Sequence, residues 1–163
     1  MLSASLIDRL REIVGPANLS TGTVDRITHS FDATQRRFLP EVVIHPGSTE
    51  EISRIVQLAN EEKIPLLPRG AGSGFSGGSL PIHGGMVLVL TRMNRILEID
   101  ADNLVAVVEP GVITADLQRA VERVGLFYPP DPASKEFSTL GGNVAECAGG
   151  PRCVKYGVTR DYV

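Results

Sequence analysis

Apolar residues recur every three or four positions in three stretches of the chain, which is the spacing of one face of a helix. The first stretch begins at Ser5, the predicted N-cap, and ends at Gly15-Pro16. The second, STEEISRIVQLANEEK, opens with Ser48 and Glu51 at capping-box spacing, and the third runs over residues 114–125. The predicted inward faces are Leu6, Leu10, Ile13 and Val14; Ile52, Ile55, Val56 and Ala59; and Leu117, Ala120, Val121 and Val124.

Short runs of β-branched and apolar residues predict the strands. EVVIHP and IPLLP flank the second helix, and MVLVL and LVAVVEPG follow further along the chain. RILEIDADN joins these last two runs, and its Asp-Ala-Asp-Asn supplies turn chemistry. The remainder is mostly loop by composition, with one short helix in TLGGNVAECAGG. This order of elements predicts an α+β or mixed α/β fold.

Composition narrows the class of protein. The net charge of −3 argues against nonspecific nucleic-acid binding, which needs clustered Lys and Arg. No apolar run reaches the length of a membrane span, and the first residues lack the pattern of a secretory signal. Cys147 and Cys153 are spaced unlike a zinc site and are interpreted as reduced thiols. We therefore expect a cytoplasmic protein with no nucleic-acid partner, no membrane span and no metal.

The stretch PRGAGSGFSGGS, residues 68–79, is the strongest functional signal. Residues 72–77 spell G-x-G-x-x-G, but that dinucleotide fingerprint needs a helix to begin inside it, and here a strand follows. The Lys-Ser/Thr ending of a P-loop is also missing. Successive glycines can still aim several N–H groups at one anion, so the loop suits a diphosphate. The alternative interpretation is a flexible Gly/Ser-rich connector.

A second glycine-rich stretch, STLGGNVAECAGG, favours the binding interpretation. Gly141-Gly142-Asn143 and Gly149-Gly150 flank small residues. Two glycine walls suit a long, phosphate-containing ligand that runs between them.

In order, the motifs PRGAGSGFSGGS, VEPGV, YPPDPAS, TLGGNVAECAGG and KYGVTRDYV resemble the FAD-binding domain of the vanillyl-alcohol oxidase/PCMH flavoproteins. Within that family the resemblance is to the glycolate oxidase and D-lactate dehydrogenase type. It implies a helical lead-in over 1–39 and an FAD-binding PCMH-type domain over 40–163, with two α/β subdomains and FAD between them. The first subdomain would span about 40–110 and the second would begin at about 111. The domain would be truncated at its C-terminus, and the substrate-binding cap domain would be absent.

The resemblance also implies a set of FAD-binding residues. The first loop would wrap the diphosphate and the second would line the isoalloxazine and ribityl portions. Because the first loop carries Ser73 and no His, we expect noncovalent FAD. The implied residues are Arg69, Gly70, Ala71, Gly72, Ser73, Gly74, Gly77, Gly78 and Ser79, and Pro130, Ser138, Thr139, Gly141, Gly142, Asn143, Gly149, Tyr156 and Gly157. If Gly74 needs a positive φ or a close backbone approach, Gly74→Val should impair diphosphate binding.

The activity implied by the resemblance is oxidation of a small 2-hydroxy acid, with hydride passing from substrate C2 to flavin N5. Electrons would leave to an iron–sulfur partner subunit, which could also bring the protein to a membrane surface, or to another acceptor. The resemblance assigns no catalytic residue to this chain. The alternative is a truncated or split module that binds flavin or a partner without turnover of its own.

Overall fold

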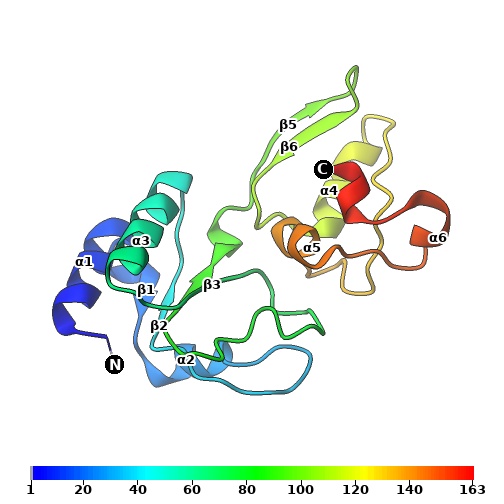
Figure 1. Cartoon of the computed structure of the whole chain (residues 1–163). Helices are drawn as coiled ribbons and strands as arrows, with labels where there is room; N and C mark the ends of the chain where they lie inside the picture. The colour runs from blue at the N-terminus through cyan, green and yellow to red at the C-terminus, as the bar shows by residue number, and fades with distance from the viewer. Residues whose placement is uncertain (1) are drawn as a thin grey trace. The chain divides into compact units, whose positions relative to one another are not determined.

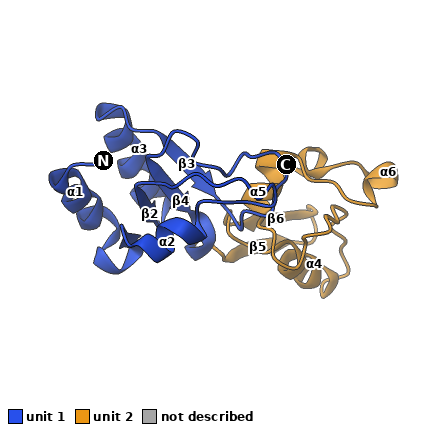
Figure 2. Ribbon diagram, turned by 90° about the horizontal axis from the view of Figure 1, so that it is seen from below, with its two compact units in different colours: residues 1–92 blue, residues 93–163 orange. Residues whose placement is uncertain are grey.

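The computed structural model describes residues 2–163, which form two compact units divided between Arg92 and Met93 (Figures 1 and 2). Each unit has its own apolar core. The subdomain boundary near residue 110 that the resemblance implies stays a prediction.

A four-stranded sheet forms the centre of the first unit, in the order β1-β2-β4-β3. β2 (Val42–Ile44) and β3 (Leu66–Arg69) both pair parallel with β4 (Met86–Val89), whereas β1 (Leu19–Ser20) is antiparallel to β2. All residues of β2 and β4 are buried, as expected of parallel strands covered on both faces. The predicted strands in EVVIHP, IPLLP and MVLVL are therefore confirmed.

Two helices, α1 (Ala4–Val14) and α3 (Thr49–Glu61), share one core cluster with one face of this sheet. The cap of α1 was predicted wrongly: Ser3, not Ser5, accepts the N–H of Leu6, at 3.2 Å. Ser48 caps α3 as predicted, accepting from the N–H of Glu51. The carboxylate of Glu51, however, accepts from the N–H of Gly47 instead of completing a capping box.

The buried face of α3 also differs from the prediction. Val56 is exposed, and Leu58 is buried in its place together with Ile55 and Ala59. Ile55, Leu58 and Ala59 all belong to the cluster that includes α1 and the sheet. Contact with α1 thus decides which flank of the apolar stripe is covered.

His45 follows β2 directly and lies among charged groups. Its ring meets that of His29 edge-on, with 5.7 Å between the ring centroids. Its carbonyl accepts from Nη1 of Arg92 at 2.6 Å. Burial lowers the pKa of His45; the charges of His29 and Arg92 lower it further, and Asp25 opposes them.

We expect the free energy of unfolding to decrease as the pH falls below 6.5, the ordinary pKa of His45. Between that value and its lower folded-state pKa, the unfolded chain binds more protons and is stabilised. Urea titrations from about pH 8 down to about pH 5 measure this slope. His45→Gln should reduce it, whereas His83→Gln, at an exposed position, should not. Equal slopes for wild type and His45→Gln would contradict the assignment.

The second unit contains the antiparallel hairpin of β5 (Ile96–Asp100) and β6 (Val105–Val108), followed by α4 (Thr114–Glu122) and α5 (Leu140–Glu146). The segment interpreted as a connector is therefore itself a strand. The turn chemistry is confirmed, because Oδ1 of Asp100 accepts from the N–H groups of Asp102 and Asn103. Val124 is exposed, contrary to the prediction, because α4 ends before it.

Several shorter elements were not predicted individually. They include α2 (Thr23–Thr28), which contacts β2, α6 (Cys153–Tyr156), and the 3-10 turns Pro16–Asn18 and Thr159–Tyr162. The short helix expected in TLGGNVAECAGG is confirmed as α5. Among residues 2–163, no helix is both long enough and apolar enough to cross a bilayer.

Candidate cofactor site

The glycine loop, defined here as residues 70–79, connects β3 to the segment before β4 and contains no helix, as the sequence predicted. Within residues 2–163, the backbone N–H groups of residues 71–75 make no hydrogen bond to the chain. Phe75, at the middle of the loop, is 82% exposed. The loop thus presents a run of free amide donors, which is the feature of an anion-binding nest.

Two glycines of this loop adopt positive φ angles, Gly72 at 70° and Gly77 at 81°. Gly74 is not among the positive-φ residues of the described chain, so the φ argument for Gly74→Val is wrong. The conformational requirement falls on Gly72 and Gly77 instead, because L side chains are strained at such angles.

Arg69, the last residue of β3, lies at the start of the loop and is only 6% exposed. Its guanidinium donates from Nη2 to the carbonyl of Phe31 at 2.7 Å and from Nη1 to the carbonyl of Ser79 at 3.1 Å. Burial lowers the pKa of Arg69 and the charge of Asp32 opposes that shift, but a guanidinium keeps its proton. A fixed positive charge therefore lies buried at the base of the loop.

These observations fit the diphosphate of FAD. Unpaired amide donors and a nearby buried cation both favour anionic oxygens, and the left-handed glycines let the backbone turn its N–H groups to one side. Residues 70–79 would hold the diphosphate through their backbone N–H groups, and Ser73 and Ser79 carry hydroxyl groups that can add donors.

Two predicted site residues of the second unit, Ser138 and Asn143, belong to a buried polar network. Nδ2 of Asn143 donates to Oγ1 of Thr114 at 2.6 Å, and the Thr114 hydroxyl lies 2.8 Å from Oγ of Ser138. The N–H of Thr114 also donates to the carbonyl of Ser138, at 3.0 Å. All three side chains are buried. The network ties the start of α4 to α5 and to the segment between them.

Further contacts involve the predicted residues Thr139, Gly141, Gly142 and Pro130. Thr139 caps the helix by accepting from the N–H of Gly142 at 3.3 Å. Gly141 donates its N–H to the carbonyl of Pro110 at 2.8 Å, and a Cβ at Gly141 would lie 2.7 Å from Cβ of Pro110. This glycine therefore permits close contact between α5 and the turn that follows β6. The carbonyl of Pro130 accepts from Nε2 of Gln118 at 2.8 Å.

The last predicted residues lie near the end of the chain. The carbonyl of Gly149 accepts from the N–H of Asp131 at 2.9 Å, joining two of the sequence motifs. Tyr156 is partly exposed and packs edge-on against Phe127, with 5.5 Å between ring centroids. Gly157 donates its N–H to the carbonyl of Cys153 at the end of α6. The cofactor roles of all these residues stay predictions.

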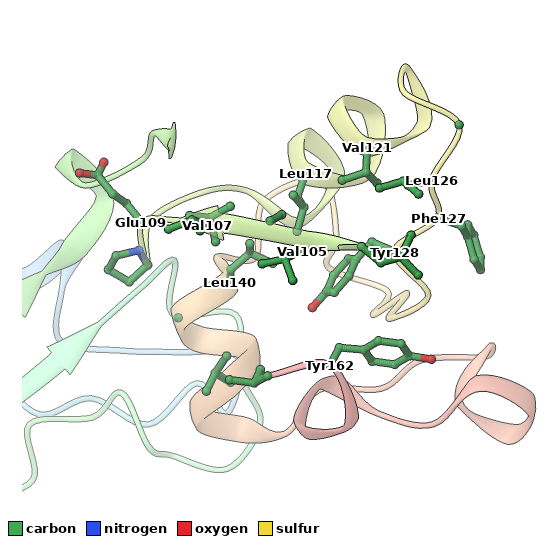
Figure 3. A pocket seen from close by; sticks show the side chains of 18 residues that line it. Val105, Val107, Glu109, Leu117, Val121, Leu126, Phe127, Tyr128, Leu140 and Tyr162 are labelled. Carbon is green, nitrogen blue, oxygen red and sulfur yellow. The ribbon is translucent and has the colours of Figure 1, made fainter. Parts of the chain in front are cut away.

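A cavity of about 810 Å³ opens within the second unit, between the hairpin, α4 and α5 (Figure 3). Val105, Val107, Leu117 and Leu140 line it with apolar side chains, and Tyr128 and Tyr162 line it with aromatic rings. Burial raises the pKa of Tyr128, and a hydrogen bond with Thr159 opposes the shift. Of the predicted site residues, Gly141 alone lines this cavity.

Sequence reasoning missed several residues that shape the candidate site. Thr114 and Gln118 were placed on a helix but not near the second glycine stretch, and Phe31 and Asp32 were not connected with the first. Glu109, within VEPGV, is buried and accepts from the N–H, Nε and Nη2 of Arg95. For Glu109, the only sequence signal was that a charged residue lies within the motif VEPGV. No sequence signal indicated the other four residues.

Comparison with known proteins places the chain in a family. Residues 40–163 match the family described as "FAD binding domain". A glycolate oxidase subunit, GlcD, of Bacillus subtilis is 50% identical over 100% of this chain and 35% of its own length. A D-lactate dehydrogenase of Anaerostipes hadrus is 44% identical over 99% of this chain and 34% of its own.

A solved structure of alkyldihydroxyacetonephosphate synthase superposes on 99% of the chain and 33% of its own length, with a TM-score of 0.89 and 30% identity. The chain thus spans about a third of the length of the relatives it matches. The family match covers more than half of the chain and includes both glycine stretches. The chain therefore belongs to the FAD-binding domain family, and its cofactor is FAD.

Proposed function

We propose that this chain is the FAD-binding part of a flavoprotein that oxidises a small 2-hydroxy acid such as glycolate or D-lactate. The observation that carries the proposal is the level of identity to a glycolate oxidase subunit and to a D-lactate dehydrogenase over essentially the whole chain. FAD, when bound, supplies the site that takes up a hydride from substrate C2.

In this proposal the chain's residues bind and orient the cofactor. The free amides of residues 71–75 and the left-handed Gly72 and Gly77 support a diphosphate-binding role for the glycine loop. The buried network of Thr114, Ser138 and Asn143 supports a rigid second wall of the FAD site, formed by the second glycine stretch. Because the loop has no His, we propose that FAD is held without a covalent bond. The two subdomains with FAD between them, over residues 40–163, belong to the same proposal.

The chemistry further needs a base for the substrate hydroxyl and a cation for its carboxylate. None of the residues that the motifs assign has either role, and the chain spans only a third of the relatives' length. We therefore propose that other parts of the protein supply these groups. We also propose that an iron–sulfur subunit accepts the electrons. The proposed location is cytoplasmic, with attachment to a membrane only through such a partner.

We expect the 163-residue chain to bind FAD without oxidising glycolate or D-lactate. FAD binding is measured by the quenching of flavin fluorescence, and turnover by reduction of a dye acceptor. A longer polypeptide that adds the remaining two thirds of the relatives' length, covalently or in trans, should restore turnover. Robust dye reduction by the chain alone would instead place a base and a carboxylate anchor within it.

The second candidate function is a flavin-binding or partner-binding module without turnover, because the chain belongs to the FAD-binding domain family and none of the residues that the motifs assign has a catalytic role. It predicts that no added polypeptide confers 2-hydroxy-acid oxidation. Strong NAD binding without a flavin response would contradict the proposed flavoprotein and the flavin-binding form of the module.

A further inference from the structure

We propose that Arg69 is a positioning residue that braces the glycine loop against residues 29–38, and that FAD affinity depends on this brace. The inference rests on the proposed role of the loop in holding the diphosphate. It assigns the Arg69 side chain to the support of the loop, whereas the sequence motif assigned the residue to the diphosphate itself.

The first support is that one side chain joins the two ends of the loop. Arg69 precedes the loop directly, and Ser79 ends it. Nη1 of Arg69 donates to the Ser79 carbonyl at 3.1 Å and lies 3.5 Å from its Oγ. This contact holds the two ends of the loop together, which lowers the conformational freedom of the residues between them.

The second support is a firm acceptor on the other side. Nη2 of Arg69 donates to the Phe31 carbonyl at 2.7 Å. Phe31 forms an antiparallel bridge with Arg37, whose guanidinium lies 5.8 Å from the Phe31 ring centroid. Oδ1 of Asp32 accepts from the N–H and the hydroxyl of Thr34, at 2.8 and 2.6 Å. These local contacts order the segment that presents the Phe31 carbonyl to Arg69.

Asp32 adds an electrostatic link. Its carboxylate is buried, and its Oδ2 atom has no hydrogen-bond partner. A buried carboxylate oxygen without a donor is costly unless a positive charge lies nearby. Arg69 is the cation next to this segment, because its Nη2 donates to the carbonyl of Phe31, the residue before Asp32. The charge of Asp32 favours the charged form of Arg69 and so opposes the effect of burial on the Arg69 pKa.

The third support is contact with the loop backbone itself. A Cβ at Gly72 would lie 2.1 Å from Nη2 of Arg69 and 2.5 Å from its Cζ. The guanidinium thus occupies the space that a side chain at position 72 would need. A Lys ammonium cannot reproduce the planar fork that reaches both carbonyls, so Arg69→Lys should release the loop while keeping the charge.

The test compares Arg69→Lys with Arg92→Lys in the 163-residue chain. Arg92 is a matched control: it belongs to the same unit, donates to the His45 carbonyl at 2.6 Å and lies 2.7 Å from the Cβ position of Gly47. Loss of charge-assisted hydrogen bonds should weaken FAD binding by Arg69→Lys roughly 10- to 100-fold. Arg92→Lys should change it by less than about threefold. Circular dichroism and thermal unfolding establish that both variants fold.

A second readout needs no FAD. Chymotrypsin cleavage after the exposed Phe75 reports how freely the loop opens, because a protease must accommodate an extended segment. Cleavage should be faster in Arg69→Lys than in Arg92→Lys at matched thermal stability. Asp32→Ala should also speed it, and the double variant Asp32→Ala/Arg69→Lys should add less than the sum of the single effects.

Gly77→Val distinguishes two hypotheses: that Arg69 positions the glycine loop, and that the loop binds the diphosphate. It imposes strain at a φ of 81°, and its Cβ position has only ordinary contact with Leu80, at 3.6 Å. If Gly77→Val leaves FAD affinity unchanged, the loop does not hold the diphosphate. If Gly77→Val weakens binding but Arg69→Lys equals Arg92→Lys, the brace is wrong. Should Arg69→Lys not fold, Asp32→Ala decides, and equal Phe75 cleavage in Asp32→Ala and wild type overturns the proposal.

Discussion

Gly85→Ala is expected to destabilise the first unit by about 3 kcal/mol or more, because it combines backbone strain with a main-chain clash. Gly85 has a φ of 73°, and a Cβ there would lie 2.2 Å from the carbonyl oxygen of Pro65. That oxygen is held in place by the N–H of Met86 at 2.9 Å. The Gly85 carbonyl in turn accepts from the N–H of Glu41 at 2.8 Å. The added methyl group therefore disrupts the sheet at the start of β4.

The adjacent Gly84 provides the matched control. Its φ of 69° is nearly the same, but its Cβ position has only an ordinary contact, 3.7 Å from Oε1 of Glu41. Gly84→Ala should therefore carry the cost of the left-handed backbone alone, about 1 to 2 kcal/mol. Urea titration of both variants measures the difference. Equal losses for the two would show that the contact with Pro65 relaxes without cost.

Thr114→Val is expected to lower the free energy of unfolding of the second unit by about 2 to 4 kcal/mol. Valine keeps the shape of the side chain but removes the hydroxyl that Asn143 donates to and that lies beside Oγ of Ser138. Both partners are buried, so each is left without a hydrogen bond at that position. The loss of stability comes mainly from burying unpaired polar groups, because valine fills nearly the same volume as threonine.

Thr114→Ser is the control, since it retains the hydroxyl and removes only a methyl group. It should cost about 1 kcal/mol. Thermal unfolding monitored by circular dichroism compares the two variants. A Thr114→Ser variant as unstable as Thr114→Val would contradict the network, because packing of the methyl group would then account for the loss. If the second wall holds FAD as proposed, Thr114→Val should also weaken flavin binding.

Local sequence signals were sufficient for most elements and for the two glycine stretches. β2 and β4 follow from their runs of apolar and β-branched residues, because strands that are buried on both faces need such residues at every position. The absence of a helix after Gly77 followed from the strand-like MVLVL, and this excluded the common dinucleotide fingerprint correctly. The number of ordered motifs was enough to indicate FAD.

Predictions failed where contacts with residues distant in sequence determine burial or secondary structure. Val56 and Leu58 lie on opposite flanks of the apolar stripe of α3, and packing with α1 and the sheet buries Leu58 and leaves Val56 exposed. The segment of β5 carries charged residues that favour a turn, and its pairing with β6 makes it a strand. Hydrophobic spacing cannot settle either case, because it records which residues are apolar and not what covers them.

The sequence by itself determined that a glycine-rich loop without a helix lies between two strands, since glycine content and flanking strands are local properties. Only the tertiary structure decided how the loop is held. The carbonyl of Phe31 meets Arg69 across 38 positions of sequence, and Thr114 meets Asn143 across 29. Such contacts depend on chain segments that folding brings together. A buried polar group is stable only where that folding supplies it with a partner.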